Sequence, residues 1–148
     1  MDTSKQYVEM CSKAKEIQDL QPVIKDTWDD EDYRYTSFYY FPNEHDTENG
    51  GSIRIFKWDN DECHPIIGDY HDNAEGCIWL PRQDQLQNMI EGNLNHLILS
   101  FQDFYMENCV FDQKFDADKI SMEQLWLAFV MKEKYSKIWN GTDWIEIK

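Results

Sequence analysis

Apolar residues recur at helical spacing within the first twenty positions of the chain. The residues concerned are Tyr7, Cys11, Ala14 and Ile17, with Met10 alongside. A spacing of three and four residues places them on one face of a helix from about Ser4 to Leu20. Pro22 should end this helix, because the residue before a proline disfavours the helical conformation.

Two runs of aromatic and β-branched residues follow, Tyr33–Phe41 and Ser52–Trp58. Such residues favour extended strands. Pro42 and Gly50-Gly51 delimit a polar segment between the two runs, so we expect them to pair as an antiparallel hairpin with a long loop. After Trp58 the pattern dissolves into Asp, Asn, Gly and Pro, and residues 59–76 are expected to form a loop.

Helical periodicity returns after a short apolar run, Cys77–Leu80, which predicts a strand or the approach to a helix. Pro81 is expected in the first turn of this helix, where proline is best tolerated. The periodic apolar positions are Leu86, Met89, Ile90, Leu94, Leu97, Ile98, Phe101, Phe104 and Tyr105. Gly92 interrupts them, and since glycine costs about 1 kcal/mol inside a helix, we predict a kink or a break there.

The C-terminal third begins with a helix start signal. Ser121 and Gln124 have the spacing of a capping box, in which each side chain satisfies the free backbone N–H of the other residue. An amphipathic helix is therefore predicted from Ser121 to Tyr135. Further on, Asn140-Gly141 is the favoured pair for a two-residue type I′ turn, because both positions of that turn need positive φ.

The arms of this predicted hairpin carry Trp139 and Trp144. An isolated two-stranded hairpin is marginal in water, so we expect it to pack on the preceding helix. These elements together predict an α+β fold, with a small antiparallel sheet flanked by N-terminal and C-terminal helices and a final Asn-Gly hairpin. Residues 1–148 are expected to form a single domain, with an acidic, loop-rich middle at about 26–76.

The composition supports a folded core despite a mean hydropathy of -0.75, because aromatic residues make up 15% of the chain. The formal net charge is -15, and it is uneven. Residues 26–75 contain 14 acidic and 3 basic side chains, a net charge of -11, which leaves -4 for all the others. Such a chain should be repelled by nucleic acid and by anionic membranes, and its charged partners should be basic.

The cysteines are scattered, without a C-x-x-C pair, at Cys11, Cys63, Cys77 and Cys109. The first residues lack the apolar stretch of a signal peptide, and the longest apolar run, Leu125–Met131, is too short to span a bilayer. We therefore expect a soluble protein of a reducing cytosol, with the cysteines as free thiols.

Three blocks of the sequence together resemble small proteins encoded by tailed phages and prophages of Gram-positive bacteria. They are Trp79–Leu86, Ser121–Tyr135 and Trp139–Trp144, and the segment Ala14–Gln18 also fits. The resemblance covers most of the chain except the acidic middle. It implies a phage or prophage setting and transfers no catalytic residues, because the family has no assigned activity.

Two segments contain residue types that bind metal ions. Cys63, His64, His71 and Cys77 are the ligand types of a structural zinc site, but adjacent residues cannot easily reach one tetrahedral centre. Asp59–Glu62 offers oxygen ligands for calcium, without the alternating carboxylates of an EF-hand loop. A solvated loop and an acidic turn are favoured, so we expect no bound metal and no cofactor.

A nuclease half-site is the remaining chemical candidate. Glu146-Ile147-Lys148 has the form E-x-K, and Asp116 or Asp118 could supply a further carboxylate. Lys148 is the last residue of the sequence, however, and a chain with a net charge of -15 is a poor ligand for DNA. The alternative function is accordingly a small metal-dependent hydrolase or nuclease that uses carboxylates of the middle segment.

The leading hypothesis is a non-enzymatic phage or prophage accessory protein that binds another protein. Its acidic surface would mimic the phosphates of nucleic acid or steer a basic or nucleic-acid-binding host or phage protein. The competing interpretation is a solvated surface that only maintains solubility. The candidate contacts, chosen by charge or as exposed aromatics, are Asp29, Asp30, Glu31, Asp32, Tyr35, Tyr39, Glu44, Asp46, Asp59, Asp61 and Glu62. The sequence predicts no catalytic residue and leaves the oligomeric state open.

Overall fold

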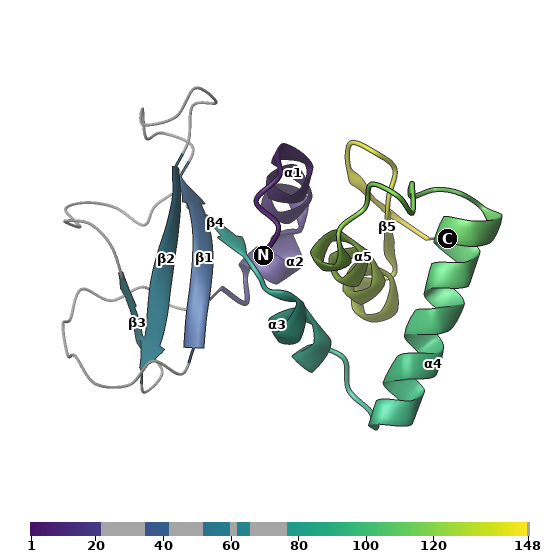
Figure 1. Cartoon of the computed structure of the whole chain (residues 1–148), viewed down its shortest axis with the longest axis horizontal. Helices are drawn as coiled ribbons and strands as arrows, with labels where there is room; N and C mark the ends of the chain where they lie inside the picture. Colours follow the sequence, from purple (N-terminus) through teal and green to yellow (C-terminus); the bar gives the residue numbers. More distant parts are fainter. Residues whose placement is uncertain (22–34, 42–51, 60–61, 66–76, 148) are drawn as a thin grey trace. The chain divides into compact units, whose positions relative to one another are not determined.

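The computed structural model describes residues 1–21, 35–41, 52–59, 62–65 and 77–147 (Figure 1). Between residues 35 and 65, side chains are described only for Tyr39 and Tyr40. The chain divides into two compact units, Thr3–Pro81 and Met1–Asp2 with Arg82–Lys148. Helices and small antiparallel sheets make the protein α+β, as predicted. The single-domain organisation of residues 1–148 stays a prediction.

The first unit, Thr3–Pro81, begins with α1 (Lys5–Lys13) and α2 (Lys15–Gln18). Ser4 caps α1, since its Oγ accepts a hydrogen bond of 3.2 Å from the backbone N of Tyr7. One continuous helix was expected, but Ala14 leaves the helical region with a ψ of 71° and separates the two. The predicted apolar face is confirmed, because its members are completely buried: Tyr7, Met10, Cys11, Ala14 and Ile17.

Four antiparallel strands form the sheet of this unit, in the order β3-β2-β1-β4. Their bounds are β1 (Tyr35–Phe41), β2 (Ser52–Asp59), β3 (Glu62–Pro65) and β4 (Ile78–Leu80). The pairing of β1 with β2 confirms the predicted hairpin. The expectation of a loop throughout residues 59–76 is wrong for β3, which pairs with the edge of β2 opposite Trp58 and Lys57. That pairing depends on a neighbouring strand, so the local composition of residues 62–65 did not reveal it.

Side chains of α1 and α2 form hydrogen bonds with the backbone of β4 and of the residue that follows it. The Gln18 amide accepts a hydrogen bond from the Trp79 backbone N at 2.8 Å and donates one to the Trp79 carbonyl at 3.0 Å. It thus replaces a neighbouring strand at one residue of a sheet edge. The buried Tyr7 hydroxyl donates to the Pro81 carbonyl.

The second unit contains α3 (Gln83–Asn88) and α4 (Leu94–Tyr105). Pro81 lies before the N-cap residue Arg82, so the expectation that it occupies the first helical turn is wrong. The Gln85 side chain accepts from the Arg82 backbone N at 2.9 Å, which gives α3 its start. The predicted break at Gly92 is confirmed, because this residue has a φ of +136° and α4 begins only after it.

A π-helix, η1 (Met106–Phe111), continues directly from α4. Asn108 is buried in it and donates from Nδ2 to the Phe104 carbonyl at 2.8 Å. Its own carbonyl accepts from the backbone N of Phe115 at 3.2 Å. The sequence gives no signal for this change of helix type, since residues 106–111 continue the helical composition of α4.

The central helix of this unit is α5 (Met122–Tyr135). The Ser121 Oγ accepts from the Gln124 backbone N at 3.1 Å, the N-cap bond that the sequence predicted. Every residue from Gln124 to Met131 is buried. A helix that is buried on all sides belongs to a core, and α5 contacts α3, α4 and the following strand.

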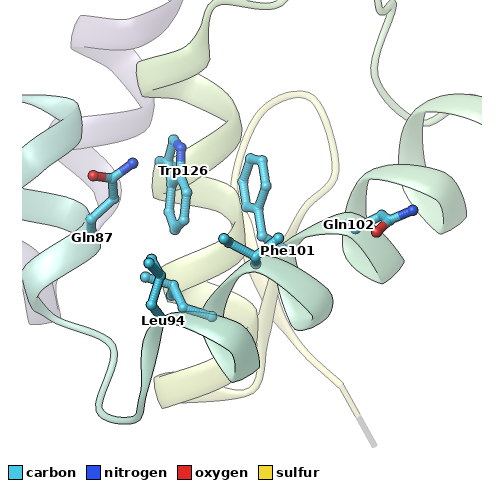
Figure 2. Close-up of a pocket in the computed structure, with 7 residues that line it drawn as sticks. Gln87, Leu94, Phe101, Gln102 and Trp126 are labelled. Atoms are coloured by element: carbon cyan, nitrogen blue, oxygen red, sulfur yellow. The ribbon is translucent and has the colours of Figure 1, made fainter.

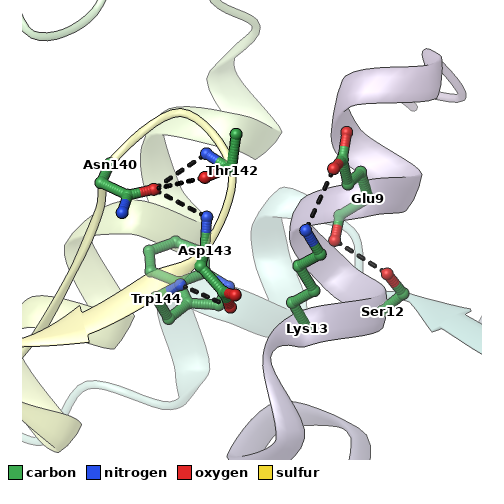
Figure 3. Close-up of polar contacts among 7 residues, drawn as sticks. All are labelled: Glu9, Ser12, Lys13, Asn140, Thr142, Asp143 and Trp144. Carbon is green, nitrogen blue, oxygen red and sulfur yellow. Dashed lines mark hydrogen bonds and ion pairs between the residues drawn. The ribbon is translucent and has the colours of Figure 1, made fainter.

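The chain ends with β5 (Lys137–Trp139) and β6 (Trp144–Glu146), which pair antiparallel with Trp139 opposite Trp144. The expected two-residue type I′ turn is wrong. Four residues connect the strands, and among the described non-glycine residues only Gln113 and Ser136 have positive φ. The Asn140 Oδ1 instead accepts hydrogen bonds from both N and Oγ1 of Thr142 and from the backbone N of Asp143 (Figure 3). β5 contacts α5, which it follows in the chain, and Trp139 and Trp144 are both buried; the packing of the whole hairpin on the helix stays a prediction.

Candidate functional site

Most of the acidic residues proposed as contacts lie outside the described residues. These are Asp29, Asp30, Glu31, Asp32, Glu44, Asp46 and Asp61. Asp59 and Glu62 are opposite each other in the register of β2 and β3, and their side chains are likewise outside the described part. A recognition role for the acidic segment therefore stays a prediction.

Among the proposed aromatic contacts on β1, the structure describes the side chain of Tyr39. Tyr39 is completely buried, so the interpretation of this residue as an exposed contact is wrong. The physical reason is its place on an inner strand, where it lies opposite Arg54 of β2 and Trp79 of β4. Tyr40 is half-buried. The Tyr35 side chain lies outside the described residues.

Of the four zinc candidates, only Cys77 has a described side chain, and burial raises its pKa. Burial also raises the pKa of the Cys109 thiol. Both remain thiols at neutral pH and are weak nucleophiles and weak metal ligands in that form. Within the described residues, no cluster of three or more His, Cys, Asp or Glu side chains could hold a metal ion.

The carboxylates of the nuclease candidate are engaged locally. Asp116 accepts from Lys119 at 2.7 Å, and this contact lowers the pKa of Asp116 and raises that of Lys119. The same carboxylate accepts from the Asp118 backbone N at 3.1 Å. Glu146 lies exposed on β6, and Lys148 is outside the described residues. The partners of the Asp116 carboxylate therefore lie at residues 118 and 119, in the loop that precedes α5.

A groove lies beside α4 in the second unit (Figure 2). Its volume is about 270 Å³. It is lined from three helices by Gln87, Leu94, Leu97, Ile98, Phe101, Gln102 and Trp126. In Figure 2 the rings of Trp126 and Phe101 stand next to each other above Leu94, and the Gln87 amide points toward Trp126.

Aromatic contacts set the position of α4 against α5. The Phe101 ring stacks on Trp126 with centroids 4.0 Å apart and planes 6° from parallel. Phe129 meets Phe101 edge-on at 5.3 Å and Phe104 at 5.4 Å. Such pairs are worth about 0.5–1.5 kcal/mol beyond their buried area. The groove wall at Trp126 and Phe101 is therefore held in place by packing.

The apolar arc of α4 is wider than the part that α5 covers. Successive residues of a helix are separated by about 100°, so Leu94, Ile98 and Tyr105 fall on one strip beside Phe101. Leu94 is 69% exposed and Ile98 is 53% exposed, whereas Phe104, on the flank toward α5, is buried. The strip thus presents large apolar side chains to solvent along the groove.

The groove lacks the groups that acid–base or nucleophilic chemistry needs. None of its seven lining residues is ionisable or carries a hydroxyl or thiol. The Trp126 indole N–H is buried and has no hydrogen-bond partner within the described part of the chain. A volume of 270 Å³ also falls below the roughly 300–1,000 Å³ of small-molecule sites. A groove with this lining can bind an apolar side chain of another molecule.

The sequence pattern predicts that these residues lie on helices, but it does not predict the groove. The available signal was the width of the apolar pattern, which includes neighbouring positions such as Leu97 and Ile98. The apolar face of α4 is wider than the face that packs against one neighbouring helix. The sequence alone could not say which flank would stay open.

Comparison of the chain with models of known protein families, with curated proteins and with solved structures finds no match. In the part of the chain that the structure describes, every helix is too short or too polar to cross a bilayer.

Proposed function

We propose that this protein is a non-enzymatic binding module whose partner is a basic protein. The observation that carries the proposal is the open apolar flank of α4, with Leu94 and Ile98 more than half exposed beside the groove. Exposed apolar patches of this kind mark interaction sites on soluble proteins. The chemical character of the groove favours binding over catalysis.

The charge distribution supports the basic character of the partner. The net charge of -15 acts over a Debye length of about 8 Å at physiological ionic strength and attracts basic surfaces during encounter. The groove itself is uncharged. Long-range attraction and short-range apolar contact would then act at different stages of binding. The phage or prophage accessory role is part of the proposal and rests on the sequence resemblance alone.

The experiment compares capture of partners from a bacterial host lysate by three forms of the protein, at low and high salt. One variant replaces Asp29, Asp30, Glu31 and Asp32 with Asn or Gln. Its control neutralises the same number of charges among exposed residues of the second unit: Asp118, Glu133, Asp143 and Glu146. We expect a discrete set of basic proteins that high salt and the first variant reduce and the control retains. Equal capture by all forms in both salts would contradict the proposed function.

A further inference from the structure

We propose that the groove beside α4 receives one amphipathic helix of the basic partner, whose largest apolar side chain enters the pocket next to Trp126. The inference rests on the proposed function and specifies how the partner is held.

The exposed strip has the spacing that receives another helix. The exposed Leu94, Ile98 and Tyr105 and the half-buried Phe101 beside them follow one another at intervals of four, three and four residues. Residues at these intervals form a straight seam along a helix, the pattern that a partner helix meets with its own apolar face. α4 has 12 residues, a length of about 18 Å. This length accommodates about three turns of a bound helix.

The pocket size selects a side chain over a free ligand. At 270 Å³ the cavity is smaller than a typical small-molecule site and open along the exposed strip. Gln87 and Gln102 bring amide groups to its lining, and an amide both donates and accepts hydrogen bonds. A large apolar side chain of the bound helix enters the cavity, while the rest of that helix lies against Leu94 and Ile98.

Charge decides between a basic helix and a second copy of this chain. Two copies would each carry a net charge of -15, and their approach is opposed by mutual repulsion. α4 itself has a single charged residue, Asp103, so its own surface does not offset that repulsion. A helix with Lys or Arg on its outer face is attracted to the same protein. The occupant is accordingly a basic amphipathic helix.

The test uses a synthetic helical peptide with Leu and Phe on one face and Lys on the other, and a scrambled peptide of identical composition. The indole N–H signal of Trp126 in ¹H–¹⁵N NMR spectra, assigned with Trp126→Phe, reports the groove. We expect the patterned peptide to shift this signal saturably and the scrambled peptide to leave it in place. Equal shifts with both peptides, or an unmoved Trp126 signal at saturation, would overturn the inference.

Sedimentation of the protein without peptide tests the second copy. We expect a monomer, with the Trp126 signal independent of protein concentration. A dimer whose formation moves that signal would overturn the basic helix as occupant. The two proposals fail separately: if lysate capture depends on the acidic segment while the patterned peptide leaves Trp126 unmoved, the groove inference fails and the proposed function stands.

Discussion

Two neighbouring helices of the second unit, α4 and α5, are both rich in large apolar residues and are used in opposite ways. In α5, all residues from Gln124 to Met131 are buried. In α4, only Phe104 is buried, although Leu94, Leu97, Ile98, Leu99 and Phe101 are equally apolar. The apolar residues of α5 therefore build the core, and most of those of α4 remain available at the surface.

The difference teaches that apolar periodicity identifies a helix face but not what covers it. α5 is contacted by α3, α4 and β5, and its residues from Gln124 to Met131 are buried. α4 meets α5 along one flank, through Phe101 and Phe104. Burying these apolar side chains would stabilise the protein. An apolar patch that stays exposed despite this gain is a candidate interaction site.

The largest effect is expected from Phe129→Ala in α5. This side chain is completely buried and contacts the rings of Phe101, Phe104 and Trp126. Its truncation should lower the free energy of unfolding by about 3–5 kcal/mol, since it leaves a cavity in the core. Denaturant unfolding followed by circular dichroism measures the change. A loss below about 1 kcal/mol would contradict the conclusion that α5, unlike α4, forms the core of its unit.

A smaller effect is expected from the N-caps of the two helices, and Ser121 Oγ also donates a hydrogen bond of 2.6 Å to Asp2. Ser121 Oγ caps α5, and Asn93 Oδ1 caps α4 by accepting from the His96 backbone N at 3.0 Å. Ser121→Ala should lower the free energy of unfolding by about 1 kcal/mol. Asn93→Ala should cost less, because the exposed first turn of α4 can fray without opening the core. The comparison would break down if Asn93→Ala were the more destabilising change.

The ion pair at the start of α3 should contribute least, and only above acidic pH. Arg82 donates to both carboxylate oxygens of Asp84, at 2.8 and 2.7 Å, which lowers the pKa of Asp84. A lowered folded-state pKa stabilises the protein above the unfolded pKa, and that stability is lost as pH falls through the folded value. Because the pair is solvated, Asp84→Asn should cost about 0.2–1 kcal/mol at pH 7.

The control is the pH dependence of the difference in unfolding free energy between wild type and Asp84→Asn. Wild type and Asp84→Asn should converge in unfolding free energy as the pH falls from the unfolded-state pKa of about 4 through the lowered folded-state pKa of Asp84, where the carboxylate in the folded protein becomes protonated. Denaturant titrations at neutral and acidic pH would measure both values. A difference that is unchanged between the two pH values would show that the charge of Asp84 does not act through Arg82.

Local signals in the sequence predicted the elements that depend on local chemistry. Gly92 separates two helices because its φ of +136° suits glycine, and Ser121 starts α5 because its hydroxyl accepts a backbone N–H. The strand β3 was missed because residues 62–65 become extended by pairing with β2. The type I′ turn was wrong because the Asn140 side chain organises a longer connection.

The candidate groove required tertiary information. The sequence places Ile98 and Phe101 on one helix, but their exposure depends on the angle at which α5 meets that helix. In the same way, the aromatic run of β1 gave no sign that Tyr39 would be buried by its position on an inner strand. Which side chains a strand or helix leaves exposed is decided by neighbours that are distant in sequence.

The most direct test of the central claim compares the affinity of the patterned peptide for Ile98→Asn and Leu99→Asn. The two residues are adjacent in α4, 53% and 60% exposed, and only Ile98 lines the groove. The substitution is the same and leaves the charge unchanged, so both variants should unfold within about 0.5 kcal/mol of wild type. We predict that Ile98→Asn raises the Kd of the peptide about tenfold and that Leu99→Asn leaves it unchanged. Equal Kd values for the two variants would contradict the assignment of this flank of α4 as the docking surface.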